Sequence, residues 1–120
     1  MKDNIVLIGM PGVGKSTVGV ILAKMIGYQF TDADLLIQKQ EGKLLHEIIA
    51  ENGTDGFIEI EERVNASIEA SHTIIATGGS VVYGKKAMEH LSRIGTVVYL
   101  KVPYDTLEKR LEDIKGRGVV

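Results

Sequence analysis

The hydrophobic and polar positions of this chain alternate between a strand pattern and a helix pattern. Residues 4–8 form an apolar run with the length and composition of a buried strand. Residues 15–26 then carry apolar side chains at helical spacing, with Val18, Ile21, Leu22 and Met25 at positions i, i+3, i+4 and i+7. Gly27 follows as a helix stop. This part of the chain therefore predicts a strand, a glycine-containing loop and a helix.

The rest of the chain repeats the alternation. Strands are predicted at residues 73–76 and 96–102. Helices are predicted at residues 34–40, 44–52, 55–71, 85–93 and 105–114, with glycine stops at Gly42, Gly53 and Gly95 and with Asp105 and Glu108 as a capping box. Such alternation predicts an α/β fold, in which a parallel sheet lies between two layers of helices. Sheets of this kind bind ligands at the carboxyl ends of their strands.

The loop between the first strand and the first helix carries the clearest chemistry. Residues 9–16 read GMPGVGKS and fit the phosphate-binding pattern G-x-x-x-x-G-K-[ST], the P-loop. Glycines let the backbone N–H groups face a phosphate, Lys15 adds a mobile positive charge, and the Ser16 hydroxyl suits Mg²⁺. The predicted nucleotide-binding residues are Gly12, Val13, Gly14, Lys15, Ser16 and Thr17. A glycine-rich turn with a chance lysine is the less favoured alternative, because the strand and helix are both in place.

An acidic pair follows the next short apolar stretch. Asp32 and Asp34 stand at i and i+2, and in extended geometry both carboxylates would project to the same side. Phosphoryl transfer needs one carboxylate near Mg²⁺ and another that accepts a proton or hydrogen bond from the attacking hydroxyl. The competing interpretation is a loop in which Asp34 is the N-cap of the following helix. Asp32-Ala33-Asp34, the P-loop and Gly78-Gly79 all follow strand-like runs, so we expect them to share one crevice.

Composition narrows the class of protein mainly by exclusion. The 120 residues are expected to form one domain, 1–120, with 44% hydrophobic and 25% charged residues. A net charge of −2 and the lack of a basic stretch argue against a nucleic-acid partner. The chain contains no cysteine, so disulfides and thiolate metal sites are excluded. Without a signal-peptide pattern or a long apolar run, we expect a cytoplasmic protein with no membrane span.

Several segments together resemble the shikimate kinase family, which comprises small P-loop kinases of the nucleoside-monophosphate-kinase type. They are GMPGVGKSTVG, FTDAD, a helix with Phe57 and Glu61, ATGGS, and GTVVYLKVP. The resemblance implies a P-loop NTPase fold and transfer of a phosphoryl group from ATP, with Mg²⁺, to a hydroxyl of the small molecule shikimate, as in aromatic amino acid biosynthesis. It also implies substrate-binding helices at about 34–71 and a monomeric protein if the chain is complete.

The resemblance assigns roles to individual residues. Lys15, Asp34 and Arg117 would be catalytic, with Arg117 in a lid that starts at about residues 114–120. Ser16 and Asp32 would serve the metal. The acceptor substrate would contact Asp34, Phe57, Glu61, Gly78, Gly79 and Ser80.

The chain departs from the family pattern at several positions. The family usually has arginine where this chain has Ile58, and that arginine clamps the carboxylate of shikimate. Glu61 is therefore expected to lack its neutralising partner, and Ser80 replaces the third glycine of a usual triple. The lid lacks the usual proline after Arg117. The family also continues beyond Val120, so we expect this chain to be a fragment with the fold truncated at the lid.

Three functions compete at this stage. The first is a small-molecule kinase, with shikimate as the family default and a non-carboxylate hydroxylated metabolite as its rival. The departures lead us to expect poor activity on shikimate. The second is a nucleoside-monophosphate kinase, which is weakened because residues 42–62 contain no arginine. The third is a non-catalytic P-loop domain that only binds nucleotide.

Overall fold

Four parallel strands form the sheet in the order β2-β3-β1-β4. The computed structural model describes residues 2–9 and 14–100. The strands are β1 (Asn4–Gly9), β2 (Gln29–Asp32), β3 (Thr73–Ala76) and β4 (Gly95–Leu100). Ile5 of β1 pairs with Ile74 of β3 on one side and with Thr96 of β4 on the other. The predicted parallel sheet is confirmed, and β1 lies inside it.

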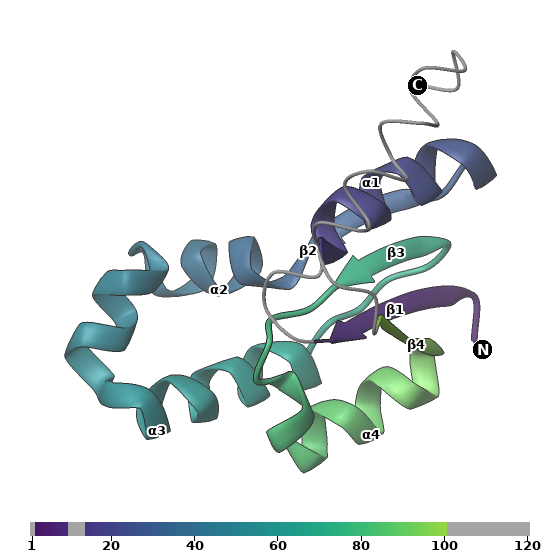
Figure 1. The fold of residues 1–120 in the computed structure, drawn as a ribbon. Helices are drawn as coiled ribbons and strands as arrows, with labels where there is room; N and C mark the ends of the chain where they lie inside the picture. Colours follow the sequence, from purple (N-terminus) through teal and green to yellow (C-terminus); the bar gives the residue numbers. More distant parts are fainter. Residues whose placement is uncertain (1, 10–13, 101–120) are drawn as a thin grey trace.

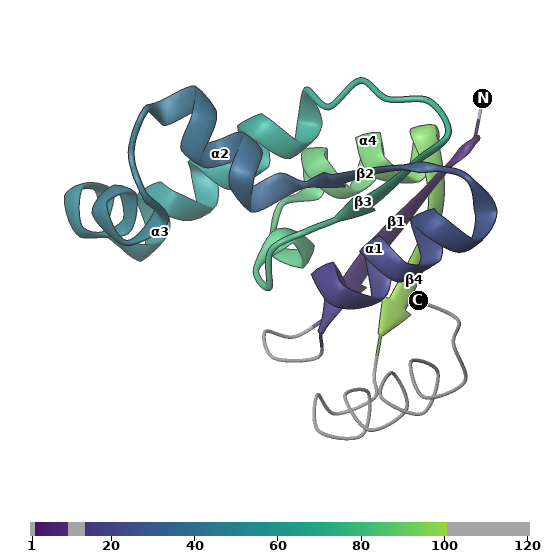
Figure 2. The same cartoon turned by 90° about the horizontal axis from the view of Figure 1, so that it is seen from above.

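Helices cover both faces of this sheet, as Figures 1 and 2 show. They are α1 (Lys15–Ile26), α2 (Ala33–Glu41), α3 (Leu45–Ala66) and α4 (Lys85–Ile94), with a short 3-10 turn η1 (Val81–Tyr83) before α4. α1 packs on one face, while α4 and the end of α3 lie on the other. This arrangement is the three-layer α/β/α fold that the sequence predicts. None of the helices in the described ranges is both long and apolar enough to cross a membrane.

The core divides into two parts because β1 and β3 are buried on both faces. On one face, Leu7 and Ile74 pack against Ala23 of α1. The opposite face is built around Val6, Ile75 and Leu91. Strands that are covered on both sides read as continuous apolar runs, and both runs stand out in the sequence for that reason.

A third apolar cluster joins α2 to α3, which extend away from the sheet (Figure 1). Its buried members are Ile37, Ile48 and Val64. Gly53 has φ 72° and ψ 174°, a conformation that breaks the helical path inside α3. Residues on both sides of Gly53 are helical, as predicted, and the two helical parts form the single kinked element α3.

The end of α3 differs from the prediction. The helix stops at Ala66 and not at residue 71. The Ser67 hydroxyl donates to the Val64 carbonyl oxygen over 2.8 Å, which satisfies a terminal carbonyl without a further helical turn. The chain then turns so that Ile68 joins the core beneath the sheet. The predicted helix at 105–114, the last residues of the strand predicted at 96–102 and the start of the lid lie outside the described residues.

Asn4 joins three segments at the amino ends of the strands. Its side-chain nitrogen donates to the carbonyl oxygens of Ala70, at 2.9 Å, and Ile94, at 2.8 Å. Its side-chain oxygen accepts from the backbone N–H of Thr73 over 3.0 Å. Asn4 is only 2% exposed, so this polar residue is buried with hydrogen bonds from both ends of its amide.

Candidate functional site

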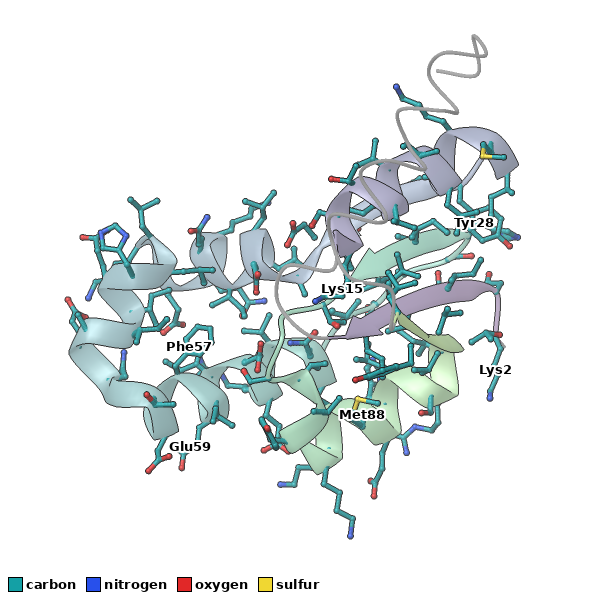
Figure 3. The ribbon with its side chains drawn as sticks, viewed as in Figure 1. Lys2, Lys15, Tyr28, Phe57, Glu59 and Met88 are labelled. Atoms are coloured by element: carbon teal, nitrogen blue, oxygen red, sulfur yellow. The ribbon has the colours of Figure 1, made fainter. Side chains whose placement is uncertain are left out.

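The carboxyl ends of β1, β2 and β3 bring the candidate residues to one edge of the sheet. Leu7 and Asp32 both pair with Ala76, so the three strands finish at nearly the same level. Gly14–Ser16 come after β1, and residues 78–80 come after β3. The acidic pair lies at the end of β2, which finishes at Asp32. Figure 3 shows Lys15 beyond the carboxyl end of the sheet, between α1 and the side chains of α3. The expectation that these segments lie together at one edge of the sheet is confirmed, while a crevice between them stays a prediction.

Lys15 begins α1, directly after Gly14, which has φ 80°. A side chain at that φ would be strained, so glycine suits this turn. The Lys15 side chain is largely buried, and Nζ donates to the Gly9 carbonyl oxygen over 2.8 Å. Burial lowers the pKa of Lys15, while the carboxylates of Asp34, Asp32 and Glu61 oppose that change. One ammonium group therefore lies within electrostatic reach of three carboxylates.

Asp32 caps α2 and also accepts a hydrogen bond from Ser16, whereas one alternative from the sequence gave the capping role to Asp34. Its Oδ1 accepts from the Asp34 backbone N–H over 2.8 Å, so Asp32 is the N-cap of α2. The alternative in which Asp34 is the cap is therefore wrong, and so is the extended geometry expected for the pair. Asp34 lies in the first helical turn, because a capping carboxylate bends the chain at once. The other Asp32 oxygen accepts from the Ser16 hydroxyl over 3.0 Å.

Ser16 and Asp32 provide a hydroxyl and a carboxylate side by side. Mg²⁺ prefers oxygen ligands of this kind, and it is often held by one or two carboxylates together with phosphate oxygens and water. Within the part of the chain that the structure describes, no group of three or more acidic, histidine or cysteine side chains could hold a metal by itself. Ser16 and Asp32 could therefore contribute two oxygen ligands to Mg²⁺.

Asp34 and Glu61 lie against the same glycine. A Cβ placed on Gly78 would come within 2.9 Å of Asp34 Oδ1 and would also contact Glu61 Oε2. Burial raises the pKa of the Asp34 carboxyl, and the nearby Asp32 charge raises it further while Lys15 lowers it. A carboxylate with a raised pKa is a better proton acceptor. The close packing explains why a glycine stands at position 78.

Glu61 is 2% exposed, and Ser80 satisfies one of its oxygens. The Ser80 hydroxyl donates to Glu61 Oε1 over 2.6 Å. Burial raises the pKa of Glu61, and the hydrogen bond from Ser80 opposes this rise. Glu61 therefore has a hydrogen-bond partner that the sequence interpretation did not name, 19 positions later in the chain, although a hydroxyl does not neutralise charge as the family's arginine would. This contact joins α3 to the segment after β3, so the spacing of residues within one helix could not reveal it.

The remaining predicted residues have different outcomes. Phe57 is half-buried against the cluster between α2 and α3, and Figure 3 shows it on the inner side of α3. Gly79 is half-buried beside Gly78, and Thr17 is exposed near the start of α1. Gly12, Val13 and Arg117 lie outside the described residues. Binding roles for all of these residues stay predictions.

Thr77 is a residue of this region that the sequence interpretation did not assign. Both its backbone N–H, at 3.2 Å, and its hydroxyl, at 2.8 Å, donate to the Leu7 carbonyl oxygen. These bonds hold the chain leading to Gly78 against the end of β1. The signal for this role in the sequence was the position of the threonine between an apolar strand and a glycine pair.

A parallel sheet whose first strand leads through a glycine loop into a helix that starts with lysine defines a P-loop α/β kinase fold. The family model for shikimate kinase matches residues 11–120. The chain therefore belongs to the shikimate kinase family.

Similar proteins agree with this assignment. The chain is 46% identical over 110 residues to a shikimate kinase of Clostridium botulinum (strain 657 / Type Ba4), covering 91% of this chain and 65% of that protein. It is 41% identical over 117 residues to a shikimate kinase of Chlorobium chlorochromatii, covering 97% of this chain and 62% of that protein. The chain thus spans just under two thirds of the length of these curated relatives.

A solved structure shows the same fold. The shikimate kinase of Acinetobacter baumannii in complex with shikimate superposes with a TM-score of 0.77 at 35% identity. The match covers 86% of this chain and 58% of that one. Together with the sheet order, this similarity confirms the α/β P-loop kinase fold that was expected from the sequence.

Proposed function

We propose that this protein transfers the γ-phosphoryl group of ATP to a hydroxyl group of shikimate. The observation that carries the proposal is that Asp34 and Glu61 meet at Gly78, at the carboxyl end of the sheet, within electrostatic reach of Lys15. The similarity to named shikimate kinases supports the choice of acceptor. Each group has a task in phosphoryl transfer, which depends on positioning and on stabilisation of charge.

Lys15 and the start of α1 would bind the donor phosphates. The first N–H groups of α1 point out of the helix where Gly14 has no side chain to cap them, and the helix dipole favours an anion there. Lys15 would neutralise the transferring group, and the nearby carboxylates would limit the fall of its pKa. Ser16 and Asp32 would hold Mg²⁺, which neutralises phosphate charge when bound. Gly12, Val13, Thr17 and Arg117 are further proposed contacts on the donor side.

Asp34 would bind the acceptor hydroxyl. Its Oδ1 lies at Gly78 next to Glu61 Oε2, at the carboxyl end of the sheet, where the acceptor would be bound. Asp34 would orient the hydroxyl and accept its proton as the hydroxyl oxygen bonds to the γ-phosphorus of ATP and the bond from that phosphorus to the leaving oxygen of ADP breaks. Phe57, Gly78, Gly79 and Ser80 complete the proposed acceptor contacts. A cytoplasmic location and a monomeric state stay predictions.

A coupled assay with ATP and Mg²⁺ tests this function. Shikimate should be phosphorylated, and Lys15→Ala should reduce turnover by about 10²–10³, the scale for loss of one charge-stabilising donor. The same assay should include neutral polyols, other hydroxy acids and nucleoside monophosphates. Turnover of one of these acceptors without turnover of shikimate would replace the proposed substrate. Nucleotide binding without any turnover would favour the non-catalytic P-loop domain.

A further inference from the structure

Ser80 and Glu61 connect two elements that border the candidate site. Glu61 lies in α3, and Ser80 stands immediately before η1, at the end of the segment that follows β3. The Ser80 hydroxyl donates to Glu61 Oε1 over 2.6 Å. Glu61 is almost completely buried, whereas Ser80 is half-buried. A hydrogen bond to a buried carboxylate is strong, so it restricts the carboxylate to one orientation.

The two oxygens of Glu61 have different surroundings. Oε1 is held by Ser80, while Oε2 faces Gly78 beside Asp34. The charged groups that act on Glu61 are Asp34, which repels its carboxylate, and Lys15, which attracts it. The hydrogen bond from Ser80 fixes the position of Oε1 between these opposing forces. Ile58, one helical turn earlier in α3, has no donor group that could hold it instead.

We propose that Ser80 is a positioning residue of the acceptor site, and that its hydroxyl holds Glu61 so that Oε2 stays against Gly78 beside Asp34, which keeps the Asp34 carboxylate in place for the acceptor hydroxyl. This inference rests on the proposed function. It goes further because it links Asp34, the proposed acceptor-binding residue, to Glu61 and Ser80, and because it gives the Ser80 side chain a task.

Two substitutions in the full chain separate the hydroxyl from the rest of the side chain. Ser80→Ala removes the donor, and Ser80→Thr keeps it. The φ of Ser80 is −100°, which both new residues adopt without strain. We expect Ser80→Ala to raise KM for shikimate about ten-fold, the scale for loss of one hydrogen bond to a charged group. KM for ATP and kcat should change much less, and Ser80→Thr should stay close to the unmodified protein.

Other kinetic outcomes would overturn the proposal. An unchanged KM for shikimate in Ser80→Ala would show that the hydroxyl is not needed. Equal increases of both KM values would indicate a general structural defect. A loss in Ser80→Thr as large as that in Ser80→Ala would assign the effect to packing. Ser80→Gly provides a second variant without the hydroxyl, and it should match Ser80→Ala.

A second measurement does not depend on turnover. The side-chain carbon of Glu61 can be followed by NMR during a pH titration, with Glu61→Gln to assign the signal. The hydrogen bond from Ser80 lowers the pKa of Glu61, so Ser80→Ala should raise that pKa and Ser80→Thr should not. An identical titration in all three proteins would overturn the inference. If the unmodified chain failed to phosphorylate shikimate, the proposed function would fail, while this titration would still decide the role of Ser80.

Discussion

Asp32, Asp34 and Glu61 place three carboxylates around one lysine, and each carboxylate has a different environment. Asp32 is fixed by its cap to α2 and by the Ser16 hydroxyl. Burial raises the pKa of Asp34 and of Glu61. We therefore propose separate tasks for these similar side chains, because their neighbours differ.

Exchange of each aspartate for asparagine should separate these tasks. Asp34→Asn should lower kcat by about 10²–10⁴, the usual scale for loss of a general base, with little change in the Kd for ATP. Asp32→Asn should instead raise the Mg²⁺ concentration needed for half-maximal activity. Steady-state kinetics at several Mg²⁺ concentrations measure both effects. Small and equal effects of the two substitutions would mean that the pair serves only as a turn and a cap.

Ile58 should limit the affinity for a carboxylate substrate. Ile58→Arg would place a guanidinium one helical turn from Glu61, on the same face of α3. KM for shikimate should then fall about ten-fold, the scale for a new charged hydrogen bond, while KM for ATP stays constant. Ile49→Arg adds the same group at an exposed position of α3 and should have no such effect. A low KM in the unmodified protein that Ile58→Arg does not improve would contradict this expectation.

Glu61 should make the stability depend on pH. The pKa of Glu61 is raised in the folded state, so the unfolded chain releases this proton first as the pH rises above the ordinary value of 4.5. The stability that Glu61 contributes at low pH is therefore lost as the pH rises from about 4.5 through the raised pKa of the folded state. Urea titrations should measure the free energy of unfolding of Glu61→Gln and of the unmodified protein. The difference in favour of Glu61→Gln should be larger at pH 7 than at pH 4. The exposed Glu59→Gln should show no such gain, and an equal gain there would refute the explanation.

At the scale of helices and strands, local signals predicted most elements. β1 and α1 were predicted almost to the residue, because an apolar run, a glycine loop and a final glycine mark their limits. The predictions failed where a side chain bonds to the nearby backbone, as Asp32 does at the start of α2 and Ser67 does after α3. The hydrogen bond between Ser80 and Glu61 could not be predicted, because it depends on how α3 and η1 meet in the folded chain.

Asn4 should be one of the most sensitive positions for the packing of these elements. Asn4→Ala would leave the carbonyl oxygens of Ala70 and Ile94 and the N–H of Thr73 without this partner. The free energy of unfolding should fall by about 2–4 kcal/mol, since buried polar groups would lose hydrogen bonds. Urea denaturation measures this change. The exposed Asn52 makes one hydrogen bond to Ile48, and Asn52→Ala should change the stability by less than about 0.5 kcal/mol. A loss of equal size in both variants would deny Asn4 a special role.

At the scale of the whole molecule, the site joins parts that are far apart in sequence. Lys15 comes from the first helix, Asp34 from the second, Glu61 from the third, and Gly78 from the segment after β3. A ligand that contacts several of these parts should therefore stabilise the entire described fold. The stabilisation depends on ligand concentration, because only the folded state presents the assembled site.

A nucleotide should accordingly raise the melting temperature. A non-hydrolysable ATP analogue with Mg²⁺, at 100 times its Kd, should add about 2.7 kcal/mol to the free energy of unfolding. Lys15→Ala should abolish most of the shift, whereas Lys24→Ala, at an exposed position of the same helix, should keep it. Differential scanning calorimetry makes this comparison. No shift at millimolar nucleotide in well-folded protein would refute nucleotide binding by this chain.

The position of β1 within the sheet also bears on biosynthesis. Ile5 emerges from the ribosome early, but its two neighbours in the sheet are Ile74 and Thr96. The apolar residues of β1 must therefore wait until the chain has been synthesised beyond residue 73 before an adjacent strand is available. During that interval α1 is the nearest element that can shield one side of them. A nascent chain paused before residue 73 should consequently expose β1 to chaperones, and release of the pause should end that exposure.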